Sequence, residues 1–172
     1  MAKILKLGYP GGPVIEKTAR LASKKSGITF PKSYLGKDSL DFSFSGIKTA
    51  VLYHVQKLRS TQYAVRSTEI RNICYAFQEA ALDVLVDKAF LAAKMYNVNS
   101  VVIGGGVAAN NCLREKFSNA SIFHGSRAYF PVFSYCMDNA AMIGSLGEDL
   151  YKKGFRSDLY LSAEPNLEVI KC

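Results

Sequence analysis

An apolar run passes into three glycines and then into a helix start in the sequence Val101-Val102-Ile103-Gly104-Gly105-Gly106-Val107-Ala108-Ala109-Asn110. The run predicts a buried strand, and Asn110 or the asparagine after it suits the cap of a helix that reaches Phe117. Glycines let a ligand approach backbone N–H groups, and a helix N-terminus favours anions. Three glycines exceed what a turn needs, so we favour nucleotide or phosphate contact over the alternative, a tight strand-to-helix turn.

Ala109 also completes a GxGxxA pattern of the dinucleotide-binding type. Such a site needs an acidic residue about 20 positions later. Residues 116–137 contain no aspartate or glutamate, so the sequence disfavours a Rossmann site.

Helical and strand patterns alternate on both sides of this turn. Residues 69–95 repeat apolar side chains at helical spacing, with Ser67 as a candidate N-cap and Asn97 as a candidate stop. Asp138 is expected to begin the last helix and Gly154 to close it. The other predicted elements are helices at 14–24, 47–58 and 138–153 and strands at 40–44, 98–103, 121–124 and 129–133. This order predicts a layered α/β domain.

The composition is that of a globular chain, with 172 residues of which 49% are hydrophobic and 21% charged. The length suffices for one domain with a core. No apolar run approaches the roughly 18 residues of a membrane helix, and the first residues lack a signal-peptide core. Four cysteines without a CxxC pair argue against a disulfide scaffold or a zinc knuckle. We therefore expect a cytoplasmic protein without membrane contact.

The net charge of +8 is distributed unevenly along the chain. Residues 1–66 hold 12 basic and 3 acidic side chains, a net charge of +9, whereas residues 67–172 hold 10 and 11, a net charge of −1. A basic surface raises affinity for polyanions such as nucleic acids. The alternative is a solvated basic face without a partner, and charge alone leaves both open.

Three further motifs each allow a structural and a functional interpretation. Ser45-Gly46-Ile47-Lys48 fits S-x-x-K, but without S-D-N and K-T-G motifs it indicates a helix cap and a surface charge. Pro10-Gly11-Gly12-Pro13 with Glu16 could present backbone and a carboxylate to a ribose, or form only a rigid turn beside a solvated glutamate. Asp138 could ligate a metal or only cap its helix. Taken one by one, all three favour the structural interpretation.

Taken together, four motifs resemble those of the bacterial TsaD family of tRNA N6-adenosine threonylcarbamoyltransferases, both in their residues and in their order along the chain. They are Tyr9-Pro-Gly-Gly-Pro13, Asp41-Phe-Ser-Phe-Ser-Gly-Ile-Lys-Thr49, Gly105-Gly-Val-Ala-Ala-Asn110 followed by Leu113-Arg114, and Cys136-Met-Asp-Asn-Ala-Ala-Met-Ile143. The resemblance extends from about Ala2 to Tyr151. It implies an α/β fold of the actin-like, Hsp70-like ATPase type, with two ribonuclease H-like lobes and the ligand between them.

The resemblance implies transfer of threonylcarbamoyl from threonylcarbamoyl-adenylate to N6 of adenosine 37 in tRNAs that read codons beginning with A. It implies one metal, Fe(2+) or Zn(2+), bound by two histidines of an H-x-x-x-H motif in the N-terminal lobe and by the aspartate that matches Asp138. The partners it implies are tRNA, a paralogous dimerisation partner and an ATPase partner. Positions that match nucleotide or substrate contacts are Gly12, Glu16, Gly105, Gly106 and Asn110; Ser45 and Lys48 match a motif to which no role is assigned.

The chain departs from this family pattern near its beginning. It has no H-x-x-x-H and no Ser-Gly-Gly-His loop, and its histidines are only His54 and His124. We therefore expect residues 1–172 to form the C-terminal lobe of a two-lobed enzyme, with the N-terminal lobe missing and 155–172 as a tail. One carboxylate cannot hold a metal by itself, so we expect the chain alone to bind metal weakly and to be inactive. The alternative is a non-catalytic nucleotide-binding or dimerisation module of a paralogue; a metallopeptidase is disfavoured because H-E-x-x-H is absent.

Overall fold

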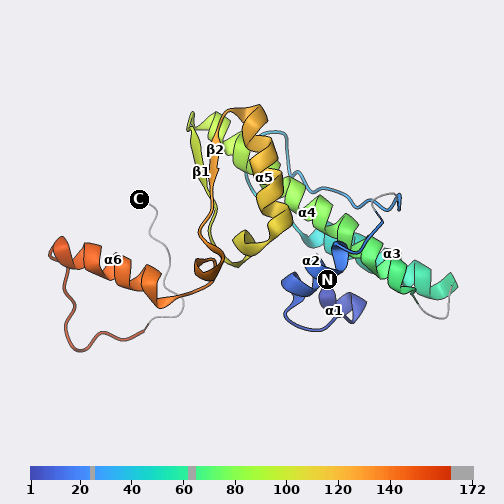
Figure 1. Cartoon of the computed structure of the whole chain (residues 1–172), viewed down its shortest axis with the longest axis horizontal. Coiled ribbons are helices and arrows are strands. Elements are labelled where there is room, and N and C mark those ends of the chain that lie inside the picture. Colours follow the sequence, from blue (N-terminus) through green and yellow to red (C-terminus); the bar gives the residue numbers. More distant parts are fainter. Residues whose placement is uncertain (24–25, 62–64, 164–172) are drawn as a thin grey trace. The chain divides into compact units, whose positions relative to one another are not determined.

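The computed structural model describes residues 1–23, 26–61 and 65–163. The chain forms two compact units, Met1–Met137 and Asp138–Cys172, and each is described by itself. The first unit (Figure 1) contains α1 (Ala2–Leu5), α2 (Gly11–Ala19), α3 (Ser45–Thr61), α4 (Ser67–Met95), β1 (Ser100–Val102), α5 (Asn111–His124) and β2 (Arg127–Tyr129), with 3-10 turns at Gly106–Ala109 and Phe133–Tyr135. The second unit contains α6 (Ala140–Lys152).

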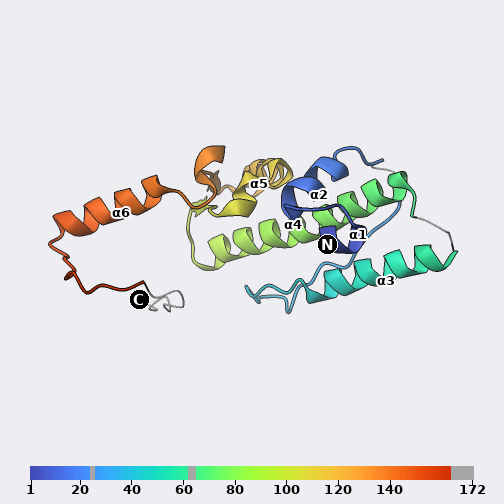
Figure 2. The same ribbon diagram turned by 90° about the horizontal axis from the view of Figure 1, so that it is seen from below.

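Helix α4 is the long element around which the first unit is built (Figures 1 and 2). It is one helix of 29 residues, which confirms the helix predicted at 69–95. Its first half shares a core of buried apolar side chains with α1, α2 and α3, and its second half shares another with α5 and the strands. Asn97 adopts φ 52° and ends the helix as predicted, because the N–H groups of Asn97 and Val98 bond to the carbonyls of Lys94 and Ala93.

The two strands form a small parallel sheet that confirms the α/β class. Ser100 pairs with Arg127 and Val102 pairs with Tyr129. Val101 and Ala128 point to the face that packs on the second core, together with α4 and α5. The strand predicted at 98–103 is therefore present, although its regular part is shorter because the glycine turn follows immediately.

Two predicted strands are wrong. Residues 121–124 form the last turn of α5, which continues past Phe117 until Gly125 ends it at φ 67°. Residues 40–44 form no strand; Phe42 makes only an isolated antiparallel bridge with Tyr34. The rings of Phe42 and Phe44 stack on each other and stay about half exposed instead of covering a core, so their alternation does not reflect a buried sheet face.

Several element ends differ from the prediction. Helix α2 already ends at Ala19 instead of reaching Lys24, which lies outside the described residues. Strand β2 shares only Tyr129 with the strand predicted at 129–133, since a 3-10 turn begins at Phe133. Ser67 is the first residue of α4, and Arg66 takes the N-cap position.

The second unit consists, in its described part, of α6 followed by residues without regular structure. Asn139 rather than Asp138 is the N-cap, because the Asn139 side chain accepts a hydrogen bond from the N–H of Met142 at 3.0 Å. Gly154 adopts φ 88° just after the helix, as predicted for its close. None of the helices in the described ranges is both long and apolar enough to cross a membrane.

Candidate functional site

Glu16 connects α2 to the first turn of α5, although 95 residues separate it from its partner. Its Oε1 accepts hydrogen bonds from the backbone N of Asn111 at 3.1 Å and from Asn111 Nδ2 at 2.9 Å. Arg20 Nη2, one turn further along α2, donates to the same oxygen at 2.7 Å. A carboxylate at this position satisfies a free N–H group of the helix start and complements its dipole. The contact fixes the N-terminus of α5 against α2.

The charged form of Glu16 is favoured by this contact. Burial raises the pKa of Glu16, but the hydrogen bonds from Asn111 and Arg20 outweigh burial and hold the pKa below its ordinary value. The side chain stays a carboxylate at neutral pH.

The glycine turn leads directly into this helix start. Gly105 adopts φ 84° and ψ 172°, a backbone conformation that residues other than glycine rarely adopt. Asn110 then caps α5 as predicted, because its Oδ1 accepts from the N–H of Leu113 at 2.9 Å. Its Nδ2 donates to Oε1 of the buried Gln78 on α4 at 3.3 Å. The asparagine cap therefore joins the turn to α4 as well as to α5.

Arg114 binds the end of the glycine turn and the segment that follows β2. Its Nε donates to the carbonyl of Ala108 at 2.7 Å, and its Nη2 donates to the carbonyl of Pro131 at 2.6 Å. The guanidinium also lies 4.1 Å from the ring centroid of Phe133. These contacts connect the glycine turn to the segment that follows β2, so Arg114 is a positioning residue for the turn.

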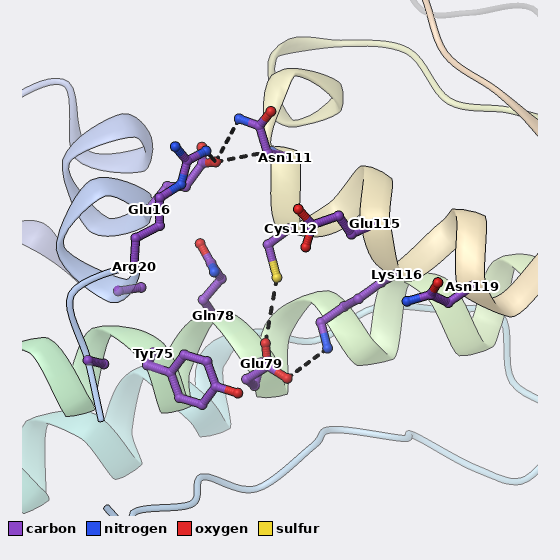
Figure 3. Close-up of a pocket in the computed structure, with 12 residues that line it drawn as sticks. Glu16, Arg20, Tyr75, Gln78, Glu79, Asn111, Cys112, Glu115, Lys116 and Asn119 are labelled. Carbon is purple, nitrogen blue, oxygen red and sulfur yellow. Dashed lines mark hydrogen bonds and ion pairs between the residues drawn. The ribbon is translucent and has the colours of Figure 1, made fainter. Parts of the chain in front are cut away.

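A pocket of about 640 Å³ lies between α2, α4 and α5. This volume is in the range of small-molecule sites in proteins. Figure 3 shows Glu16 and Asn111 at one end of the pocket and the ion pair between Glu79 and Lys116 away from that end. The pocket is lined by Glu16, Ala19, Arg20, Ala22, Tyr75, Gln78, Glu79, Asn111, Cys112, Glu115, Lys116 and Asn119.

An ion-pair network forms one wall of the pocket. Lys116 Nζ lies 2.8 Å from Glu79 Oε2 and 2.7 Å from Asp83 Oδ1, and Asp83 also pairs with Lys32 at 2.7 Å. Burial lowers the pKa of Lys116, but hydrogen bonds to both carboxylates outweigh burial and hold it above its ordinary value. The network keeps charged groups at fixed positions along this wall.

Cys112 lies in the same wall. Burial raises its pKa to about 11, and the Glu79 carboxylate 3.6 Å from the sulfur adds to this effect. The thiolate is the nucleophilic form, and the raised pKa disfavours it at neutral pH.

The structure brings some predicted site residues together and leaves others apart. Gly105, Gly106 and Asn110 form the turn at the start of α5, and Glu16 contacts the residue after it. Gly12 lies one turn before Glu16 on α2 and is exposed. Lys48 lies on α3 and does not line the pocket.

Asp138 begins the second unit and is exposed. The described ranges contain no group of three or more histidine, cysteine, aspartate or glutamate side chains that could hold a metal ion. Asp138 offers one carboxylate, so the described residues by themselves do not form a complete metal site.

Sequence reasoning missed most of the pocket wall. Gln78, Glu79 and Lys116 were not candidates, although the spacing of Glu79 and Asp83 by four residues places two acids on one face of α4. That pair of acids could have indicated a bound cation or a basic partner such as Lys116. Asn111 was considered only as an alternative helix cap.

Comparison with known proteins gives one consistent family. The sequence model of TsaD, described as tRNA N6-adenosine threonylcarbamoyltransferase, matches residues 1–145. Proteins of that name from Thermosipho africanus and Dictyoglomus turgidum are 44% identical over 169 residues and 43% identical over 167 residues. The matches cover 98% and 97% of this chain but 49% and 48% of those proteins. The chain thus spans about half the length of the curated relatives that it matches.

Proposed function

The chain belongs to the TsaD family, and from that premise we propose that its first unit binds the adenosine part of threonylcarbamoyl-adenylate during transfer of threonylcarbamoyl to tRNA. One observation carries this proposal: the Glu16 carboxylate is fixed by Asn111 at the edge of a pocket of nucleoside size. The acceptor is N6 of adenosine 37 in tRNAs that read codons beginning with A.

Glu16 is oriented to bind a ribose. The hydrogen bonds from Asn111 and Arg20 all reach Oε1, which leaves Oε2 to accept a hydrogen bond from a ribose hydroxyl. The fixed carboxylate needs little reorganisation when the ligand arrives, which favours binding. Gly12, one turn earlier on α2, has no side chain and leaves its backbone open to the same nucleoside.

The pocket and the glycine turn suit the adenine base. The amides of Gln78 and Asn111 and the ring of Tyr75 offer the donors, acceptors and apolar surface that a base requires. The glycines before α5 allow a ligand to approach the backbone of the turn. Gly105 and Gly106 are therefore assigned to packing against the adenine, and Asn110 to a contact with the nucleotide.

Asp138 is assigned as one ligand of an Fe(2+) or Zn(2+) ion. Because one carboxylate is not a metal site, two histidines of the N-terminal half of the family would complete it. The same half would complete an actin-like fold, of which this chain forms the C-terminal lobe. A paralogous dimerisation partner and an ATPase partner would act with the enzyme in the cytoplasm, where its tRNA substrate is found.

Supplying the N-terminal half of a relative to this chain tests the proposed transfer activity. We expect no threonylcarbamoyladenosine from the chain alone and clear formation when the N-terminal half of the Thermosipho africanus relative is supplied, because the metal ligands then come together. The assay uses threonylcarbamoyl-adenylate and an unmodified tRNA transcript, with the product measured by mass spectrometry. In the completed protein, Asp138→Ala should lose most of the bound metal and most of the activity.

Three outcomes would contradict parts of the proposal. Transfer by the chain alone would show that no second half is needed. Nucleotide binding without any transfer after completion would instead favour a non-catalytic nucleotide-binding or dimerisation module. Full metal content and full activity in Asp138→Ala would remove that residue from the metal site.

A further inference from the structure

Helix α3 exposes a basic face that the nucleotide pocket does not use. The basic face consists of Phe42, Phe44, Lys48 and Arg59, all of which are exposed. Residues 42–68 contain no aspartate or glutamate, so no acid within this stretch offsets the charge. The nearest acids in the sequence are Asp41 and Glu69.

The outward orientation of this face follows from the packing of α3. Ile47, Val51 and Val55 are buried, Val51 and Val55 in the first core, and in Figure 2 α3 lies at the edge of the first unit with α4 and α1 on its inner side. At 100° per residue, Lys48 and Arg59 lie about 20° apart on one side of the helix, whereas Lys57 lies about 160–180° away from them and is not part of this face. Eleven residues separate Lys48 from Arg59, about 16 Å along the helix. The two cations thus span a length that several phosphates of one strand would occupy.

The positive charges of this face are not neutralised within the described residues. No carboxylate there lies within ion-pair distance of Lys48 or Arg59. Elsewhere lysines are paired: Lys152 lies 2.7 Å from Glu148, and Lys153 lies 2.8 Å from Asp149. Arg59 donates one hydrogen bond to the carbonyl of Ile4 at 3.3 Å, and this neutral acceptor does not cancel the positive charge of Arg59. Cations that are not neutralised attract a polyanion.

Two aromatic rings stand at the start of the same helix. The rings of Phe42 and Phe44 are nearly parallel, with centroids 6.3 Å apart and planes 3° apart, and they are 49% and 44% exposed. Lys48 N donates to the carbonyl of Phe44 at 3.1 Å, so the rings directly precede the first turn. The buried Lys88 of α4 donates to the carbonyl of Asp41 and lies 5.5 Å from the Phe42 ring centroid, which anchors the segment.

We propose that this basic face binds single-stranded nucleotides of the tRNA substrate, with phosphates at Lys48 and Arg59 and an unpaired base stacked at Phe42 and Phe44. Aromatic rings beside cations are the combination that binds single-stranded nucleic acid. A duplex would use the cations alone, and unpaired RNA is where bases are free to stack. The inference rests on the proposed function for the identity of the RNA, and it gives the unassigned Asp41–Thr49 motif a role.

A charge-matched pair of variants tests the phosphate contacts. Lys48→Gln/Arg59→Gln removes two cations without a carboxylate partner, and Lys152→Gln/Lys153→Gln removes two that are paired on α6. Affinity of the 172-residue chain for an unmodified tRNA transcript is measured at several salt concentrations. We expect the first variant to reduce the slope of log affinity against log salt by about 1.5, since each lost phosphate contact removes about 0.7–0.9. The control variant should keep the slope of the unmodified chain.

Phe44→Leu tests stacking separately from charge. It keeps an apolar side chain and is expected to weaken binding to the tRNA about tenfold without changing the salt slope, because a stacked base is lost and no phosphate contact is. Binding to a duplex RNA of equal length should be unaffected. Circular dichroism of each variant at rising temperature verifies that α3 remains folded.

The outcomes separate this inference from the proposed function. An unchanged salt slope in Lys48→Gln/Arg59→Gln, or an equal loss in the α6 control, would overturn the basic face as an RNA site. Failure to bind adenosine nucleotides, with the slope change present, would refute the proposed pocket and leave the RNA site standing.

Discussion

Replacing Glu16 by alanine is expected to weaken binding of adenosine monophosphate by the completed protein roughly 10- to 100-fold, since hydrogen bonds to a charged group contribute about 1.5–3 kcal/mol each. The substitution removes the acceptor of both bonds from Asn111 and the acceptor assigned to the ribose. Isothermal titration calorimetry of the variant and the unmodified protein measures the change.

Arg20→Gln is the matched control. It removes the 2.7 Å ion pair with Glu16 but leaves both bonds from Asn111 in place. Because Arg20 is well exposed, its loss should change nucleotide affinity less than about threefold. Equal losses in the two variants, or full affinity in Glu16→Ala, would contradict the assignment of Glu16 to the ribose.

Replacing Phe90 by alanine is expected to destabilise the fold by about 3–5 kcal/mol, the usual range for removing a buried phenylalanine. Phe90 is 2% exposed, and its ring centroid lies 5.7 Å from that of Phe117 and 4.7 Å from that of His124. These contacts fasten α5, which carries Asn111, to α4. Urea unfolding followed by circular dichroism measures the loss of free energy of unfolding.

Phe123→Ala provides the comparison on α5 itself. Phe123 is 86% exposed, so its removal should change the free energy of unfolding by less than about 0.5 kcal/mol. A loss below about 1 kcal/mol in Phe90→Ala would mean that the second core does not hold α5 in place.

The parts of the fold that depend on local interactions could be predicted from the sequence. The helix at 67–95 follows from a long apolar repeat, and Asn97 ends it because asparagine tolerates positive φ. Asn110 caps α5 through its own side chain, which binds an N–H only three residues away. The glycine turn could also be predicted from the local sequence alone.

The two strands predicted wrongly show where local patterns are insufficient. Residues 121–124 carry Ile122 and Phe123, yet these side chains are 80% and 86% exposed on the last turn of α5. Four residues fit a helix and a strand equally well, and the position of Gly125 as the stop decides between them. Phe42 and Phe44 alternate like a strand face, but no neighbouring strand in the described ranges forms a ladder with them.

The pocket could not be predicted because its walls meet through contacts that are distant in the sequence. Glu16 reaches Asn111 across 95 residues, and Lys116 reaches Glu79 across 37. A single sequence indicates which residues are acidic or basic but not which helices will lie side by side. The resemblance to a family supplied Glu16 as a candidate, and the packing of α2 and α5 supplied its partner.

The adenosine pocket is tested most directly by hydrogen–deuterium exchange of the completed protein with and without saturating adenosine monophosphate. The prediction is slower exchange in the first turn of α5 around Asn111 and in α2 around Glu16, because the ligand lies against both, with no change in α3 or α6. Unchanged exchange at these two helices, or protection confined to other parts of the chain, would contradict the assignment of this pocket to the nucleotide.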